Sequence, residues 1–324
     1  MMDWTDRHCR YFLRLVSPEV RLYTEMITTA ALIHGDAARL LAYDPAEHPV
    51  ALQLGGSEPA ELAACAKLAE ATGYDEINLN AGCPSGRVQA GRFGACLMLE
   101  PERVADCVRA MRDAVSIPVS VKCRIGVDER DSYAELAEFV ACLVDAGLEC
   151  LIVHARKAWL QGLSPKQNRE VPPLDYPAVY RLKADFPQLH VHINGGITAV
   201  AAMIDHLARV DGVMIGRAAY HDPWILARAQ SRLTTGTSVQ ASRHQVVRNM
   251  LPYVDRQLAD GVRLQQIVRH MLGLFAGQPG ARAWRRYLSE HAHREGAGLQ
   301  VLENALDRVP EMPAGACGLG AAEL

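Results

Sequence analysis

The chain has 324 residues, of which 49% are hydrophobic and 22% charged, and its formal net charge is -3. This composition is typical of a folded globular protein with one large and one smaller domain, and the charge gives no overall sign of a nucleic-acid binder. No apolar run is long enough to cross a bilayer and the start "MMDWTDRHCR" has no signal-peptide pattern, so we expect a cytoplasmic protein without a membrane partner.

Seven short apolar runs alternate with helix-like segments over the first two thirds of the chain, which predicts a parallel sheet covered by helices. The expected strands are 20–26, 50–54, 76–80, 119–124, 150–155, 191–194 and 212–216. A closed (β/α)₈ TIM barrel has eight strands, so we expect the first strand to lie before Met1. The alternatives are an open barrel or a doubly wound sheet.

Helical patterns fill the spaces between these runs. The clearest are 7–16, 58–73 with Ser57 as its N-cap, 101–115, and 131–147, which Gly147 ends. The nine cysteines form no C-x-x-C pair and no His/Cys cluster at zinc spacing. We therefore expect no metal, and most cysteines should be small core residues.

The composition changes after residue 233. A polar linker is expected at 234–242, then a small helical domain at 243–310 with helices near 244–259, 264–276, 279–291 and 299–309, and a flexible tail at 311–324. The catalytic domain would be 1–233. The segment from Arg263 to Arg294 contains six arginines and one acidic residue, Glu290. It therefore carries about five positive charges and favours an anionic partner.

Polar residues recur where the expected strands end, which is where a barrel places its active site. They are Gln53, Asn78, Asn80, Cys83, Lys122, Arg124, His154, Arg156, Asn194, Gly195, Gly196, Gly216 and Arg217. Taken singly, His154 could be a core histidine, Lys122 could extend its amine to solvent, and Cys83 could be a packed small residue. Together they indicate an active site, and the loops "NGGI" and "GRAA" suggest a phosphate cradle with Arg217 as a charged donor.

Several motifs carry a resemblance to a known family: "MMDWTDRHCRYFLR", "PVALQLGGSEP", "GYDEINLNAGCPSGRVQAGRFGACLM", "VSVKCRIG", "HARKAWLQGLSP", "INGGI" and "DGVMIGRAAY". The chain closely resembles the flavin-dependent tRNA-dihydrouridine synthases from Met1 to about Val309. The wording "DWTDRHCR" and "HARKAWLQGLSPKQNRE" is similar to the A branch, which is associated with positions 20 and 20a of the tRNA D-loop. Members usually begin with a strand ending "AP" just before "MMDWTD", which this chain does not show.

The resemblance implies a cofactor and a set of roles. NADPH or NADH would reduce FMN, the flavin N5 would deliver hydride to C6 of uracil, and Cys83 would protonate C5. A cysteine thiol is mostly protonated at neutral pH and serves as an acid without an activating base. The implied FMN contacts are Met1, Met2, Gln53, Lys122, His154, Asn194, Gly195, Gly196, Gly216 and Arg217.

The expected substrate is tRNA, bound by a monomer. In "GARAWRRYLSEH" the spacing of Arg282, Arg285, Arg286 and Ser289 puts them on one helical face, which by itself could be an ordinary solvated face. The resemblance assigns Arg282 and Arg285 to tRNA binding, together with Lys166, Arg169 and Asn80. Access to a base in folded RNA requires that the base be splayed out.

Two other functions remain open. One is a flavin barrel that acts on a free pyrimidine, like dihydroorotate dehydrogenases, although the arginine-rich helical domain argues against it. The other is a tRNA-binding or chaperone protein that has lost turnover.

Overall fold

The computed structural model describes residues 1–233 and 241–311 and divides into two compact units. The first contains Met1–Arg7 and Arg21–Gly216, and the second contains His8–Val20 and Arg217–Leu324. The polar part of the expected linker at 234–240 and the tail beyond residue 311 lie outside the described residues. The expected boundary after residue 233 differs from this division, because residues 8–20 and 217–233 group with the C-terminal helices.

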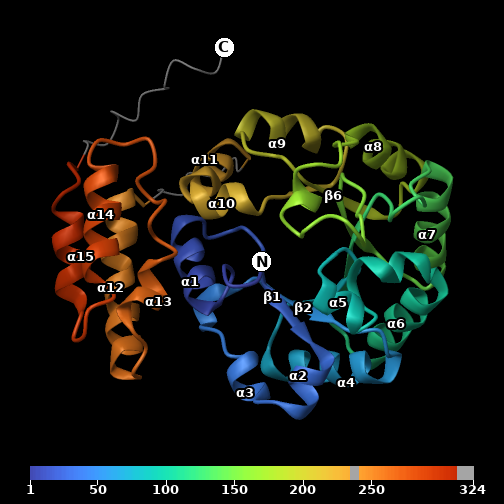
Figure 1. The fold of residues 1–324 in the computed structure, drawn as a ribbon, viewed down its shortest axis with the longest axis horizontal. Helices are drawn as coiled ribbons and strands as arrows, with labels where there is room; N and C mark the ends of the chain where they lie inside the picture. Colours follow the sequence, from blue (N-terminus) through green and yellow to red (C-terminus); the bar gives the residue numbers. More distant parts are fainter. Residues whose placement is uncertain (234–240, 312–324) are drawn as a thin grey trace. The chain divides into compact units, whose positions relative to one another are not determined.

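In the described residues of the first unit, seven parallel strands form one sheet in chain order, so each strand pairs with the next along the chain. The strands are β1 (Leu22–Thr28), β2 (Val50–Gly55), β3 (Glu76–Asn80), β4 (Val119–Arg124), β5 (Cys150–His154), β6 (His190–Asn194) and β7 (Gly212–Met214). All seven expected strands are therefore present, with small differences at their ends. The sheet curls, and helices surround it (Figure 1). The TIM-barrel type of α/β fold is confirmed, as is the helical region that follows it.

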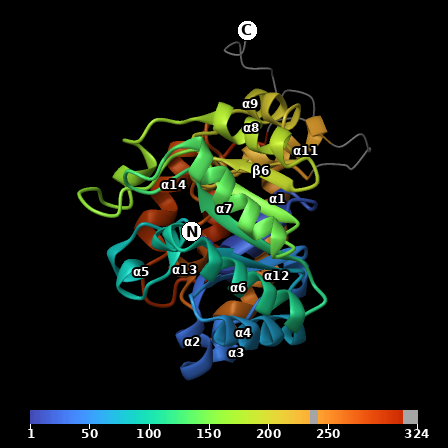
Figure 2. The ribbon, with the colours of Figure 1, turned by 90° about the vertical axis from the view of Figure 1, so that its right-hand side faces the viewer.

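The covering elements of the first unit are mostly the segments between strands. They are α2 (Thr29–His34), α3 (Ala37–Leu40), η1 (Pro45–Glu47), α4 (Pro59–Thr72), α5 (Gly86–Ala90), η2 (Gly94–Leu99), α6 (Pro101–Ala114), α7 (Tyr133–Asp145), η3 (Gln167–Arg169), α8 (Tyr176–Asp185) and α9 (Val200–Leu207). Figure 2 shows α8, α7, α6 and α4 following one another down one side of the sheet.

Some helix ends follow local sequence signals and others do not. Ser132 and Glu135 form a capping box at the start of α7, and Gly147 follows its end with φ +85°. The expected N-cap Ser57 is wrong: Glu58 holds that position without a side-chain bond, and Pro59 starts α4. Proline needs no cap for an N–H that it lacks, which removes part of the demand for a capping side chain.

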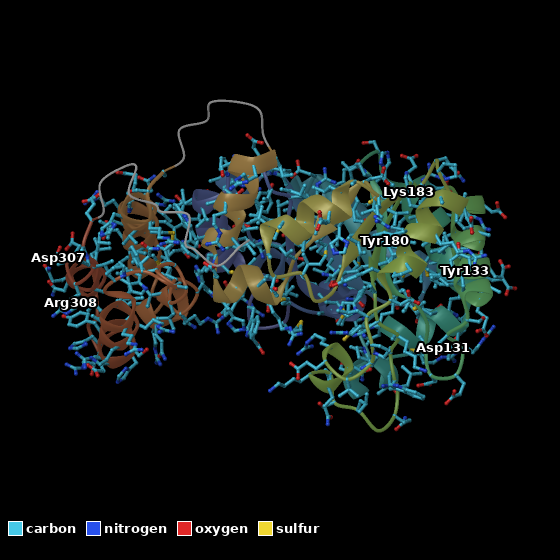
Figure 3. All side chains as sticks on the ribbon, turned by 90° about the horizontal axis from the view of Figure 1, so that it is seen from above. Asp131, Tyr133, Tyr180, Lys183, Asp307 and Arg308 are labelled. Atoms are coloured by element: carbon cyan, nitrogen blue, oxygen red, sulfur yellow. The ribbon has the colours of Figure 1, made fainter. Side chains whose placement is uncertain are left out.

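Polar pairs join the outer helices of the first unit. The Tyr133 hydroxyl donates to Asp185 at 2.5 Å, and the Arg181 guanidinium lies over the Tyr133 ring at 3.8 Å. Tyr180 is bonded to Nδ1 of His206 at 2.7 Å, which connects α8 to α9. Figure 3 shows Tyr133 and Tyr180 on the outer helices of this unit.

The alternation of side chains along the strands makes the inner face of the sheet polar. On β3, Ile77 and Leu79 are fully buried and face the helices, while Glu76, Asn78 and Asn80 point to the other side. This polar inner face supplies the candidate site.

The second unit is helical in its described part. It contains α1 (Arg7–Val16) except for its first residue, and α10 (Arg217–His221), α11 (Trp224–Leu233), α12 (Arg243–Ala259), α13 (Leu264–Val268), α14 (Ala281–His291) and α15 (Leu299–Leu306). Helix α1 groups here because Tyr11 stacks on Tyr253 of α12 at 3.9 Å and His8 is bonded to the Tyr253 hydroxyl at 2.7 Å.

One expected helix of this unit is wrong in length. The helix expected at 264–276 ends at Val268, and turns follow it. A Cβ on Gly273 would lie 2.3 Å from the carbonyl oxygen of His221, so the chain passes here against other backbone rather than continuing as a helix. The other three helices are confirmed within a few residues.

No helix of the described residues is long and apolar enough to span a membrane.

Candidate active site

Strand register brings the predicted site residues together at the carboxyl ends of the strands. Asn80 pairs with Lys122 across β3 and β4, and His154 of β5 pairs with both Arg124 of β4 and Asn194 of β6. Parallel strands have their carboxyl ends at one edge of the sheet, so these side chains share one mouth.

Cys83 is held in the loop that follows β3. The Asn80 side-chain oxygen accepts from the backbone N–H groups of Gly82 at 3.1 Å and Cys83 at 3.0 Å. The Cys83 carbonyl accepts from Ala95 N at 2.9 Å, and a Cβ on Gly94, at φ +76°, would lie 2.5 Å from that carbonyl oxygen. Cys83 is partly buried, and its Sγ lies 3.7 Å from the Ser85 hydroxyl. The thiol position is therefore fixed by bonds on both sides of the residue.

Lys122 is a partly buried cation in this mouth. Burial, together with the nearby Arg124 guanidinium, lowers the pKa of Lys122 from 10.5 to about 8. Within the described ranges its amine has no hydrogen-bond or ion-pair partner. An anion bound beside it would relieve this penalty.

Gln53 and Asn194 are amides with fixed partners. The Gln53 side-chain nitrogen donates to Asn78 at 2.8 Å, and its carbonyl oxygen accepts from Asn80 at 2.9 Å. The side-chain nitrogen of Asn194 donates to the Met214 carbonyl at 2.7 Å.

Two glycines form the loop after β6. Gly195 and Gly196 have φ angles of +114° and +70°, which L side chains rarely adopt. The Tyr176 hydroxyl donates to the Gly195 carbonyl at 2.7 Å, and a Cβ on Gly195 would lie 3.2 Å from His154 Nε2. The backbone therefore passes close to His154 with no side chain between them.

Met1 lies beside Gly216 in the first unit. A Cβ on Gly216 would meet the Met1 sulfur at 3.2 Å, and the Met1 carbonyl accepts from the N–H groups of Trp4 and Thr5 at 3.0 Å each. Met2 is 59% exposed.

Lys166 and Arg169 lie in the long loop after β5, and both side chains are exposed. The fully buried Asn168 between them organises that loop. Its oxygen accepts from Trp159 N at 2.7 Å, and its nitrogen donates to the Trp159 carbonyl at 2.9 Å and the Leu163 carbonyl at 3.2 Å.

Arg124 connects this loop to the cysteine loop. It is 4% exposed and donates to the carbonyls of Gly82 at 2.9 Å, Lys157 at 3.1 Å and Asn168 at 2.9 Å. Burial lowers its pKa to about 10. The sequence placed Arg124 at a strand end without a role, and it gave no signal at all for Asn168.

The remaining predicted residues belong to the second unit. Arg217 is the first residue of α10. Arg282, Arg285 and Arg286 are exposed on α14, whereas Trp284 and Leu288 are buried, so the helix has the basic face that the spacing predicted. Among the residues described, neither Arg282 nor Arg285 has an ion-pair partner.

The fold and the mouth residues define an α/β-barrel enzyme with an amide, an amine, an imidazole and a thiol at the carboxyl ends of its strands. Residues 1–310 match the family model described as "Dihydrouridine synthase (Dus)". The chain belongs to the dihydrouridine synthase family, which confirms the resemblance and the expected class of enzyme, an oxidoreductase.

Curated relatives agree with this family. The chain is 61% identical over 312 residues to the "tRNA-dihydrouridine(20/20a) synthase" of Salmonella typhimurium (strain LT2), covering 96% of this chain and 94% of the relative. It is also 61% identical to the protein of that name in Escherichia coli (strain K12), covering 96% and 90%, and 58% identical to that of Vibrio vulnificus, covering 96% and 95%.

Proposed function

We propose that this protein reduces uridine to 5,6-dihydrouridine in the D-loop of tRNA, at positions 20 and 20a, with FMN that NADPH reduces. The names of the relatives support the reaction and the substrate. The observation that carries the proposal for the site is the fixed placement of Cys83 at a mouth that it shares with Lys122 and His154.

The residues of the mouth fit a flavin mononucleotide. Lys122 is a partly buried cation, and its lowered pKa shows that its surroundings disfavour the positive charge. A negatively charged group bound beside it would offset this cost. Gln53 and Asn194 offer amides, and the positive φ angles of Gly195 and Gly196 leave backbone uncovered beside His154. We assign FMN contacts to these residues and to Met1, Met2, Gly216 and Arg217. When bound, FMN would supply the hydride that adds to C6 of uracil.

Cys83 supplies the proton in this proposal. Its thiol would protonate C5, which completes the reduction of the C5=C6 bond. Asn80 holds the Cys83 backbone through its oxygen, and its amide nitrogen donates one of its two hydrogens to Gln53. We therefore assign Asn80 a contact with the substrate base as well.

Binding of tRNA would use charge on each unit. Lys166 and Arg169 are exposed on the loop that Asn168 holds, and Arg282 and Arg285 are exposed on α14. Such contacts to phosphates give affinity without reading sequence.

The test is the dihydrouridine content of tRNA from a strain that lacks endogenous synthases. The tRNA is incubated with the protein, FMN and NADPH, and nucleosides are measured by mass spectrometry. The wild type should form dihydrouridine, and Cys83→Ala should lower the rate by about 10²-fold or more, as expected for loss of a general acid. Cys142→Ala, another partly buried cysteine of the first unit, should match the wild type.

Other outcomes separate the competing functions. Reduction of free uridine or another free pyrimidine in preference to tRNA would indicate a small-molecule enzyme. Binding of tRNA without any dihydrouridine would indicate a binding protein. A Cys83→Ala variant as fast as Cys142→Ala would refute the role of the thiol.

A further inference from the structure

A chain of hydrogen bonds runs through the inner face of the sheet and ends at Cys83. The Cys83 backbone N–H donates to Asn80 at 3.0 Å, Asn80 donates to Gln53 at 2.9 Å, and Gln53 donates to Asn78 at 2.8 Å. Asn78 donates to the Ser120 hydroxyl at 2.8 Å, and Ser120 donates to the Glu76 carboxylate at 2.5 Å. In each bond the donor is the group nearer to Cys83 along the series, and the acceptor is the group nearer to Glu76.

The two ends of this chain fix its direction. A backbone N–H can only donate, and an ionised carboxylate can only accept, whereas each amide and the hydroxyl between them can do both. Reversing any single amide would place two donors or two acceptors face to face. The bonds therefore have one consistent direction, from Cys83 to Glu76.

The chain is enclosed, so its members cannot replace a lost partner with water easily. Glu76, Asn78 and Ser120 are each 0% exposed, and Gln53 is 8% exposed. The carboxylate is itself held at the amino end of the strand, where Tyr23 donates to it at 3.3 Å and Arg21 forms an ion pair with it. Glu76 precedes Asn80 by four residues of β3, so it lies about 13 Å from the mouth.

We propose that Glu76, Ser120 and Asn78 are positioning residues for the catalytic mouth. They set which way the Gln53 and Asn80 amides face, and through Asn80 they fix the loop that holds Cys83. The catalytic meaning of this role rests on the proposed function of Cys83. The hydrogen-bond chain itself does not depend on that function.

The physical consequence of breaking the chain is specific. Without the Ser120 hydroxyl, the buried amide nitrogen of Asn78 loses its acceptor, which is costly for a buried donor. Asn78 regains a partner only by turning, and Gln53 must then turn as well. The Asn80 nitrogen consequently loses its acceptor, and the bond that the Cys83 N–H donates to the Asn80 oxygen weakens.

The test compares two substitutions on β4. Ser120→Ala and Cys123→Ala each remove one heavy atom from a residue that is 0% exposed, but the two side chains lie on opposite faces of the strand. Only Ser120 belongs to the chain of hydrogen bonds, so Cys123→Ala controls for a general loss of packing.

Two readouts are measured. In the cofactor-free protein, amide hydrogen exchange at Gly82 and Cys83 should be at least fivefold faster in Ser120→Ala and within twofold of wild type in Cys123→Ala. In the loaded enzyme, Ser120→Ala should lower kcat for dihydrouridine formation at least fivefold and leave KM for tRNA within twofold. Equal exchange rates in the two variants would overturn the proposal.

A second variant covers a failure of Ser120→Ala to fold. Glu76→Gln keeps the shape of the side chain but replaces a group that only accepts by one that can also donate. The direction of the hydrogen bonds is then no longer fixed at this end. Exchange at Cys83 should rise two- to fivefold, and an unchanged rate overturns the proposal. Failure of the proposed function is distinguishable, because it would appear as a wild type that forms no dihydrouridine, whatever the exchange rates are.

Discussion

At the scale of single residues, the burial of Lys122 makes the stability of the protein depend on pH. Its pKa falls from 10.5 to about 8 because burial disfavours the ammonium form. Between these values the unfolded chain holds a proton that the folded chain has lost, so the free energy of unfolding of the cofactor-free protein should rise as pH rises from about 8 to 10.5. Below about pH 8 the buried charge lowers stability.

Replacing this lysine should therefore separate stability from binding. We expect Lys122→Met to raise the free energy of unfolding of the cofactor-free protein at pH 7 by up to about 3 kcal/mol, since one pKa unit is worth 1.36 kcal/mol. The gain in stability should shrink as pH rises through the interval given above. The variant should also bind FMN more weakly than the wild type, or its flavin should be reduced more slowly. Urea denaturation and flavin titration measure the two effects, with the exposed Lys67→Met as control. A variant that binds FMN like wild type and is reduced as fast would contradict the assigned contact.

The residues that sequence identified and those it missed differ in a physical way. Cys83, Lys122 and His154 were predicted as site residues because each lies near or just past the end of a strand, and the strands are evident from their apolar runs. Asn168 and Arg124 were missed as organising residues because their partners are main-chain groups, in the same loop for Asn168 and in distant loops for Arg124. No pattern of side chains in one sequence encodes such contacts.

At the scale of elements, the loop after β5 depends on the side chain of Asn168. We expect Asn168→Ala to weaken tRNA binding several-fold, because Lys166 and Arg169 lose a fixed loop although their charges remain. The lost bonds should also lower stability by about 1–3 kcal/mol, since partly buried N–H and C=O groups of the loop lose their partners. Filter binding and thermal unfolding measure both effects.

The matched control for this loop is Gln161→Ala, whose side chain is exposed in the same loop. It should leave binding and stability unchanged. Equal tRNA affinity in the two variants would show that the order of the loop does not matter for binding.

Elements were also predictable to different degrees. The seven strands were found from apolar runs bounded by polar residues, because a covered parallel sheet needs such runs. The helix expected up to residue 276 was not correct, because Met271, Leu274 and Phe275 have helical spacing and are buried, yet they lie in turns. Burial alone therefore does not distinguish a helix from successive turns.

At the scale of the whole molecule, the grouping of α1 with the C-terminal helices is a long-range effect. His8 and Tyr253 are separated by 245 residues, and their bond could not be predicted from local pattern. The basic face of α14, in contrast, follows from spacing within one helix, and the structure exposes it as expected.

This basic face gives the prediction for tRNA affinity. Replacing both Arg282 and Arg285 by Ala should weaken tRNA binding and reduce the slope of log K against log salt by about 1–2, because each phosphate contact releases about one counterion. Cys83 remains in place, so dihydrouridine formation at saturating tRNA should be lowered much less than at limiting tRNA. Binding is measured across a series of salt concentrations.

Arg228→Ala is the control within the same unit, because its guanidinium is already paired with Asp222 at 2.7 Å. A paired arginine has little charge to offer a phosphate, so its loss should leave the salt slope unchanged. If the double variant kept the wild-type slope, the arginines of α14 would be an ordinary solvated face. The phosphate contacts would then have to come from other cations, with Lys166 and Arg169 as the first to test.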